Sequence, residues 1–292
     1  MAAQGVDQAR VRAVHEQELR RFTDERPRTV SLLSRAGASM PNGVPMSWMA
    51  ADNDLPVYVT EGRGARFTDV DDHTYVDTNV ADMASFCGYG DPRISAAVAD
   101  RADVGTTFLL PSEEAVVVAE ELARRYPVPL WQFTLSASTA NAEAIRVARA
   151  ATGRDVVVLF DGHYHGHFDE ATVTLDGGDP APFGTGLPRD VARNVRIVQF
   201  NDAEALREAL RPRDVAIVLT EPALTNNVGL QMPEPGFHDA LRDATREAGT
   251  VLALDETHTH IVGPGGCTRL WDLRPDVVTL GKAVGGGVPF GA

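Results

Sequence analysis

The chain has 292 residues, of which 43% are apolar and 23% are charged. This length and composition are typical of a globular protein with one large domain or two smaller ones. With 41 acidic and 27 basic side chains, its net charge of −14 disfavours non-specific binding to nucleic acids or anionic membranes. Small-molecule chemistry is therefore the expected kind of function.

Targeting and redox signals favour a cytoplasmic protein. The two cysteines, Cys87 and Cys267, are far apart and form no CxxC motif. The N-terminal segment mixes charged and apolar residues and contains no stretch that resembles a signal peptide or a membrane span. A helix is predicted over residues 7–23.

The first third of the chain predicts a small N-terminal α+β subdomain, residues 1–111. Turn formers at 41–48 and 53–56 predict a loop. Short β-rich runs in 56–77, separated by Gly-Arg-Gly and Asp-Asp, predict an antiparallel meander.

From residue 112 the pattern changes to helices that alternate with short apolar strands, which predicts a large α/β domain over 112–292. Such alternation is typical of a mostly parallel central sheet with flanking helices. The strands are expected at 131–135, 155–160, 195–200, 215–221, 250–256 and 276–281, with helices at 139–151, 202–210 and 236–248.

Chemically distinctive residues follow several of these strands, where parallel sheets build their ligand sites. Lys282 lies between the strand VVTLG and the sequence AVGGGVP, so its amine is well placed to form an imine. The alternative is an ordinary surface lysine. Asp255 ends the apolar run VLALD, where a buried carboxylate needs a cationic partner such as a pyridinium nitrogen. Its alternative is a helix cap or a loop salt bridge.

Ser136, Ala137 and Ser138 lie between a predicted strand and the start of a predicted helix. Hydroxyl groups and free backbone N–H groups at a helix N-terminus suit a phosphate ester. Simple N-capping by serine explains the same pattern.

The segment 161–167, DGHYHGH, admits two interpretations. Tyr164 could stack on a planar ring. Alternatively His163, His165 and His167, joined by His258 and His260, could bind zinc. The zinc interpretation gives Lys282 no role, so we prefer a cofactor. Glu221, at the end of VAIVLTE, lines the cavity or forms an ordinary turn.

Taken in order, FTLSASTANAEAIRVARAATGR, LFDGHYHGHFDE, LTEP, LALDET and TLGKAVGGGVPFGA resemble the class III, fold-type I pyridoxal-phosphate enzymes. The resemblance covers roughly residues 56–292. Within that class, GRGARFTDVDDHTYVD and YHGH are most similar to the glutamate-1-semialdehyde aminomutase branch and its neighbours, the β-amino-acid and D-phenylglycine type aminotransferases.

The resemblance implies a role for each matching residue. It makes Lys282 the Schiff-base lysine for pyridoxal 5'-phosphate and Asp255 the partner of the pyridine nitrogen. It makes Tyr164 the stacking aromatic and assigns the phosphate to residues 136–138. The cofactor site is also expected to include His165, Glu221 and Thr257.

The sequence departs from the family pattern in three places. Ala137 and Thr139 replace the usual glycine and glutamate of the phosphate loop. Thr257 replaces an apolar residue on the second ring face, with His258 and His260 after it. The chain ends ten residues after Lys282, so we expect it to be truncated before the family's C-terminal domain.

The resemblance implies an aminotransferase that moves an amino group between an amino acid or amine donor and a keto-acid acceptor. An aminomutase of the glutamate-1-semialdehyde type and a truncated non-catalytic binding module are the alternatives. A metal-dependent hydrolase that uses the histidines is a further one. A homodimer is implied, and neither a nucleic acid nor a membrane is expected as a partner.

Overall fold

The computed structural model describes residues 7–51, 55–188, 190–226 and 229–292. These form two compact units, one of residues 1–80 with 88–97 and one of residues 81–87 with 98–292. In the described residues no helix is long and apolar enough to cross a membrane.

The first unit contains the predicted helix and the predicted meander. Helix α1 (Gln8–Asp24) begins at Asp7, whose carboxylate accepts hydrogen bonds from the N–H groups of Ala9 and Arg10. Helix α2 (Pro27–Ala36) follows. Strands β1 (Val59–Arg63), β2 (Arg66–Asp69) and β3 (Thr74–Val76) pair antiparallel in that order. The predicted loop contains short 3₁₀ turns at Pro41–Gly43 and Ser47–Ala50, and its residues 53 and 54 lie outside the described residues.

A buried carboxylate organises the end of this meander. Asp69 is fully buried and accepts a hydrogen bond from the hydroxyl of Tyr75 at 2.7 Å. The guanidinium of Arg26, itself buried, lies 3.6 Å away. His73 contributes its backbone N–H at 2.9 Å and its ring Nδ1 at 3.2 Å. These contacts supply the partners that a buried charge requires.

The second unit is built on a five-stranded parallel sheet in the order β12-β11-β8-β4-β7. The strands are β4 (Val156–Phe160), β7 (Val195–Val198), β8 (Val215–Thr220), β11 (Val251–Asp255) and β12 (Val277–Thr279). All five were predicted from their runs of valine, leucine and isoleucine, which are typical of strands buried on both faces. Every residue of β8 is buried.

The sixth predicted strand, at 131–135, is wrong. In this segment only Thr134 pairs, through two backbone hydrogen bonds to Gly291. Leu135 is 77% exposed, so the apolar character that suggested a core strand does not reflect burial within this chain.

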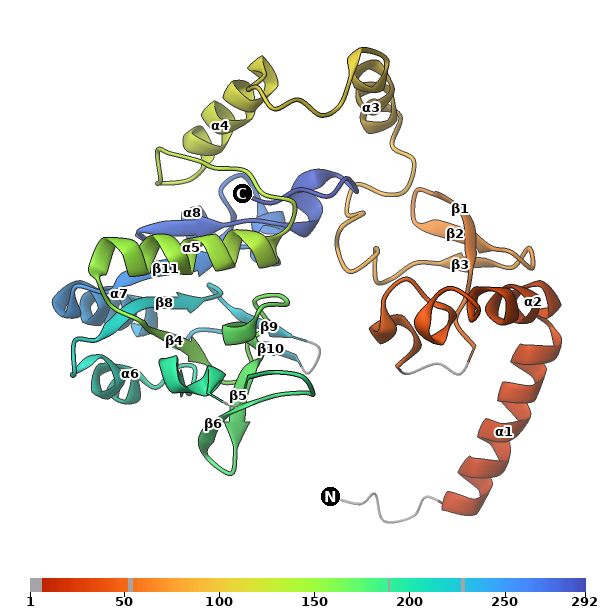
Figure 1. Ribbon diagram of the computed structural model, residues 1–292, viewed down its shortest axis with the longest axis horizontal. Coiled ribbons are helices and arrows are strands. Elements are labelled where there is room, and N and C mark those ends of the chain that lie inside the picture. The colour runs from red at the N-terminus through yellow and green to blue at the C-terminus, as the bar shows by residue number, and fades with distance from the viewer. Residues whose placement is uncertain (1–6, 52–54, 189, 227–228) are drawn as a thin grey trace. The chain divides into compact units, whose positions relative to one another are not determined.

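Helices cover both faces of the sheet (Figure 1). Helix α5 (Ala137–Thr152) packs Ile145 against Val157 and Leu159 on one face. Helices α6 (Ala203–Leu210) and α7 (Phe237–Ala248) cover the other face, where Val158 and Phe160 point. Odd and even residues of β4 therefore enter different core clusters, as the two-residue repeat of a strand requires. Each such side chain stabilises the fold by about 1.5–3 kcal/mol on burial.

The structure has further helices and strand pairs outside this framework. They are the helices α3 (Pro92–Val104), α4 (Glu113–Arg125) and α8 (Gly266–Leu270), and the antiparallel pairs β5 (Val173–Asp176) with β6 (Asp179–Pro182) and β9 (Leu224–Asn226) with β10 (Gly229–Gln231).

Candidate active site

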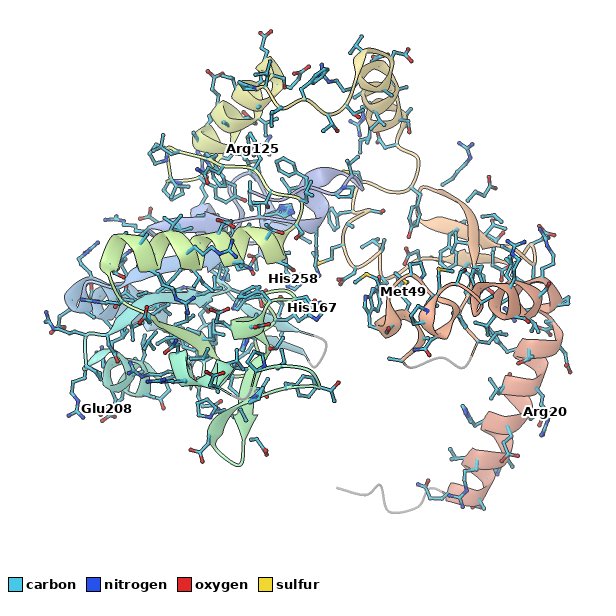
Figure 2. The ribbon with its side chains drawn as sticks, in the orientation of Figure 1. Arg20, Met49, Arg125, His167, Glu208 and His258 are labelled. Atoms are coloured by element: carbon cyan, nitrogen blue, oxygen red, sulfur yellow. The ribbon has the colours of Figure 1, made fainter. Side chains whose placement is uncertain are left out.

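A cavity of about 280 Å³ lies at the carboxyl ends of the parallel strands, within the second unit. Eight of the nine predicted site residues line it: Ser136, Ala137, Ser138, Tyr164, His165, Asp255, Thr257 and Lys282. Figure 2 labels His258, another lining residue, which marks this end of the sheet. The structure thus brings together residues from segments up to about 150 positions apart, as expected for the carboxyl edge of a parallel sheet.

Asp255 forms the base of the cavity as the last residue of β11. Its Oδ2 accepts hydrogen bonds from Asn141 Nδ2 at 2.8 Å and from His165 Nδ1 at 2.9 Å. Its Oδ1 accepts one from the backbone N–H of Thr257 at 3.0 Å. Asn141 is fixed in turn by Thr279, whose hydroxyl donates to its Oδ1 at 2.6 Å.

These hydrogen bonds keep Asp255 ionised. Burial alone would raise the pKa of this carboxyl, but the hydrogen bonds from His165, Thr257 and Asn141 outweigh burial and hold the pKa below its usual value. A buried carboxylate that stays charged and opens into a cavity can bind a cationic N–H group.

Lys282 enters the cavity from the adjacent strand. It follows β12 by three residues and adopts a left-handed φ of 51°, which is uncommon for a residue with a side chain. Gly281 brings the chain against α5 just before it, where a Cβ atom would lie 2.6 Å from that of Ala137. The Lys282 amine lies 2.6 Å from Asp82 Oδ2 and 2.9 Å from His258 Nε2.

The start of α5 forms the polar wall of the cavity. Ser136 caps the helix by accepting a hydrogen bond from the Thr139 N–H at 3.2 Å. Ser138 accepts one from the His167 N–H at 3.1 Å, which leaves its hydroxyl hydrogen available to a ligand. Gly166 packs on Ser138 so tightly that a Cβ atom would clash with it. Both the capping and the anion-binding interpretations therefore fit Ser136, since a 16-residue helix directs its free N–H groups here.

Two further lining residues have groups that nothing in the described chain satisfies. The Thr257 hydroxyl and His165 Nε2 are buried, and neither has a hydrogen-bond partner among the described residues. Tyr164 also lines the cavity and is 56% exposed. Such unpaired polar atoms are expected where a ligand completes a site.

Glu221 lies behind the cavity wall instead of lining it. Its carboxylate accepts hydrogen bonds from the Thr225 N–H at 3.0 Å and from His258 Nδ1 at 2.8 Å. Its contact with the cavity is therefore indirect, through the imidazole of His258.

The histidines of the DGHYHGH segment do not converge on one point. Both ring nitrogens of His163 lie beside backbone carbonyl oxygens, those of Phe160 at 2.8 Å and Ala171 at 3.1 Å. Burial and the neighbouring His165 lower the pKa of His163 to about 4. Among the described residues, no three His, Cys, Asp or Glu side chains are arranged to share a metal ion.

Sequence reasoning assigned no role to Asn141 or Asp82. It placed Thr225 with Glu221 among the residues that could line the cavity, whereas Thr225 hydrogen-bonds to Glu221 behind the wall. Asn141 carried a signal, since it is a polar residue on the Ala-rich face of a predicted helix, one turn after the serines. Asp82 carried none, because it reaches Lys282 from a segment 200 residues earlier.

Comparison with known proteins agrees with this geometry. The family model for aminotransferase class-III matches residues 48–292. A glutamate-1-semialdehyde 2,1-aminomutase of Methanothermobacter thermautotrophicus is 38% identical over 266 residues, which cover 89% of this chain and 63% of the relative.

Solved structures give the same result. A glutamate-1-semialdehyde-aminomutase of Pseudomonas aeruginosa superposes with a TM-score of 0.92 at 41% identity, covering 98% of this chain and 64% of its own. A variant of that enzyme in complex with PMP superposes with a TM-score of 0.93 at 40% identity, and the match covers the same shares of the two chains. An omega-transaminase of Sphaerobacter thermophilus superposes with a TM-score of 0.85 at 33% sequence identity, and the match covers 90% of this chain and 62% of that one.

The fold and the site define a protein of the fold-type I aminotransferase architecture. The chain belongs to the class III aminotransferase family, as the match over residues 48–292 shows. It spans a little under two thirds of the length of the relatives it matches.

Proposed function

We propose that this protein is a pyridoxal 5'-phosphate-dependent aminotransferase, in which Lys282 and Asp255 hold the cofactor between them. One observation carries the proposal: a lysine amine and an ionised buried carboxylate come from adjacent parallel strands and face the same cavity. An amine, an anionic base and a serine-lined helix N-terminus are the partners that an aldehyde, a pyridinium N–H and a phosphate need.

Each residue has a chemical task in this proposal. When bound, pyridoxal phosphate supplies an aldehyde for amine chemistry and a ring that withdraws electrons from the substrate's α-carbon. Lys282 would hold the cofactor through its amine, and the same amine would take and return the proton of the substrate's α-carbon. Asp255 would hold the ring nitrogen, and His165 and Asn141 fix the orientation of its carboxylate.

The other wall residues bind and shield the cofactor. Ser136, Ser138 and the first N–H groups of α5 bind the phosphate. Tyr164 and Thr257 line the cavity and would contact the ring. Glu221 contributes through His258. The partners are an amino acid or amine donor and a keto-acid acceptor.

A second candidate function is amino-group migration within one molecule. It is favoured by the similarity to glutamate-1-semialdehyde aminomutases, at 38% and 41% identity for two of them. An aminotransferase needs a second substrate to restore its cofactor, whereas an aminomutase needs none. Adding glutamate-1-semialdehyde alone, and then an amine with a keto acid, distinguishes the two by which mixture gives a product.

The assembly and setting are part of the proposal. A homodimer is supported by apolar side chains left exposed on the second unit, such as Leu109 at 104% and Leu110 at 78%. A reducing cytoplasmic setting is supported by two free cysteines. Light scattering of the purified chain tests the dimer.

Absorbance spectroscopy tests the cofactor assignment. Purified protein and Lys282→Ala are incubated with pyridoxal phosphate, and spectra are recorded before and after borohydride reduction. We expect a visible band that reduction fixes covalently to the wild type and not to the variant. A cofactor that washes away from both proteins after reduction contradicts the proposal and favours the non-catalytic binding module.

A further inference from the structure

Glu221, His258 and Lys282 form a chain of hydrogen bonds that ends at the amine. His258 Nδ1 lies 2.8 Å from Glu221 Oε2, and His258 Nε2 lies 2.9 Å from Lys282 Nζ. The three residues follow the ends of three neighbouring strands, β8, β11 and β12. A carboxylate, an imidazole and a nucleophile in this order form the arrangement that activates nucleophiles in many enzymes.

The partners determine the protonation of the imidazole. A carboxylate only accepts hydrogen bonds, so Nδ1 of His258 carries the hydrogen that Glu221 accepts. The hydroxyl of Thr225 also donates to Glu221 and holds the carboxylate in place. In the neutral ring the lone pair is then on Nε2, which faces Lys282.

The carboxylate of Glu221 offsets the cost of placing a proton on the mostly buried His258 ring. The Glu221 side chain is 1% exposed and that of His258 is 14% exposed. A proton that arrives on His258 creates an imidazolium beside a buried carboxylate, and the attraction between these charges is strong where water is excluded.

Other charged groups face the same atoms. Asp82 lies 2.6 Å from Lys282 Nζ on a side chain that is 66% exposed, and its carboxylate favours the charged ammonium. Asp255 opens into the same cavity. His260 follows His258 by two residues, and burial together with His258 lowers the pKa of His260 to about 4. Asp82 and His258 therefore compete for the protons of the amine.

We propose that His258, oriented by Glu221, is the base that takes a proton from the Lys282 ammonium and later returns it. In this step an N–H bond of Nζ breaks and its electron pair stays on nitrogen, while the Nε2 lone pair forms the new N–H bond. The positive charge moves from lysine to imidazole, and nothing is oxidised or reduced. The use of this amine for cofactor chemistry rests on the proposed function.

The sequence offers a direct test, because Lys282 is its only lysine. The full chain, free of cofactor, is treated with a small amine-acylating reagent between about pH 6 and pH 10. Mass spectrometry then gives the labelling rate at Lys282, with the N-terminal amine as an internal reference. Removing a positioned base typically slows proton-coupled steps by 10²–10⁴-fold, and against a reagent in solution we expect a loss of at least about tenfold near neutral pH.

Four variants define the expected pattern. His258→Gln keeps a hydrogen-bonding group but no proton acceptor, so it should slow labelling at about pH 7 and move the profile to more alkaline pH. Glu221→Gln should act in the same direction. Asp82→Asn should speed labelling, because it removes the carboxylate that stabilises the ammonium. His238→Gln is the matched control, since His238 is partly buried and bonded to the Pro222 carbonyl at 2.8 Å, away from the cavity.

Two results overturn the proposal. The first is equal rates and equal profiles in the wild type and His258→Gln. The second is a combination of two observations. His258→Gln labels Lys282 more slowly but with an unshifted pH profile, and added free imidazole does not restore the labelling rate of His258→Ala. Together these would show that His258 has a structural role only. If His258→Gln fails to fold, the labelling rate and pH profile of Glu221→Gln test the proposal in its place. Because labelling uses no cofactor, its outcome is independent of the absorbance test above.

Discussion

Asp69 and Asp255 are two buried aspartates with different surroundings. Both are almost fully buried, at 0% and 2% exposure, and both accept hydrogen bonds from a histidine ring and from backbone N–H groups. Asp69 also has an arginine 3.6 Å away and a tyrosine hydroxyl at 2.7 Å. Within the described chain, neither arginine nor lysine forms an ion pair with Asp255.

The difference separates a structural carboxylate from one that binds a ligand. Asp69 finds its cationic partner, Arg26, within the fold and does not line the cavity of Asp255. Asp255 is oriented by Asn141, His165 and the Thr257 N–H, remains ionised, and opens into a cavity whose walls contain unpaired polar atoms. A buried carboxylate that lacks an arginine or lysine partner and opens into a cavity therefore indicates where an external cation binds.

The largest expected effect comes from breaking the Asp69 cluster. Asp69→Ala removes the buried carboxylate beside Arg26 together with the acceptor of the hydrogen bonds from Tyr75 and His73. We therefore expect the free energy of unfolding to fall by about 3–5 kcal/mol. Urea denaturation followed by circular dichroism measures it. A loss below about 1 kcal/mol would show that water solvates Arg26 readily and that the two aspartates differ less than we infer.

Removing the charge of Asp255 should instead affect the cofactor. Asp255→Asn keeps the shape of the side chain but removes the anion that faces the ring nitrogen, and hydrogen bonds to charged groups contribute about 1.5–3 kcal/mol. We expect affinity for pyridoxal phosphate to fall about 10- to 100-fold, measured by absorbance titration. Asp69→Asn serves as the control with unchanged affinity. Equal losses in both variants contradict the comparison.

Lowering the pH should destabilise the unit that holds Asp255. Burial lowers the pKa of His163 to about 4, and that of His260 to about 4 as well. Histidines in an unfolded chain titrate near about 6.5, so between about pH 6.5 and pH 4 the unfolded state binds more protons. The stability from these neutral histidines is complete above about pH 6.5 and declines below it, by about 1–2 kcal/mol for each at pH 5.

Urea denaturation at pH 7.5 and pH 5 measures this decline. His260→Gln should reduce the difference between the two pH values, because it removes one of the titrating groups. If the loss of unfolding free energy between pH 7.5 and pH 5 is the same in the wild type and in His260→Gln, protonation of His260 does not contribute to it.

The smallest expected effect is at the outer end of the Asp255 network. Thr279→Val keeps the side-chain shape and removes the hydroxyl that donates to Asn141 at 2.6 Å. We expect a loss of about 1 kcal/mol in unfolding free energy and a few-fold loss of cofactor affinity, because Asn141 then holds Asp255 less firmly. Unchanged values for both quantities imply that Asn141 needs no support from Thr279.

Much of the fold could be predicted because five strands are continuous apolar runs that only a doubly covered sheet accommodates. The segment WQFTL misled the prediction, since an apolar run also occurs on an exposed surface. The hairpin of β5 and β6 was missed although Gly177-Gly178 marks its two-residue turn.

The site residues that directly follow a strand or precede a helix could be predicted from the sequence. Lys282, Asp255 and the serines follow strands or precede a helix, so the carboxyl edge of the sheet brings them together. Asn141 and Asp82 could not be assigned in the same way, because their roles arise from side-chain contacts across 114 and 200 residues. Glu221 was placed in the cavity wall, whereas His258 separates it from the cavity.

The register of β11 and β12 pairs Asp255 with Thr279, three residues before Lys282. Neighbouring parallel strands are held about 4.8 Å apart by their backbone hydrogen bonds. The sheet therefore sets the distance between the Asp255 carboxylate and the start of the Lys282 segment. The connection between these strands includes Thr257 and His258, which belong to the site, and continues through α8. Because the backbone ladder sets the spacing of carboxylate and amine, a change in length beyond His258 can leave that separation unchanged.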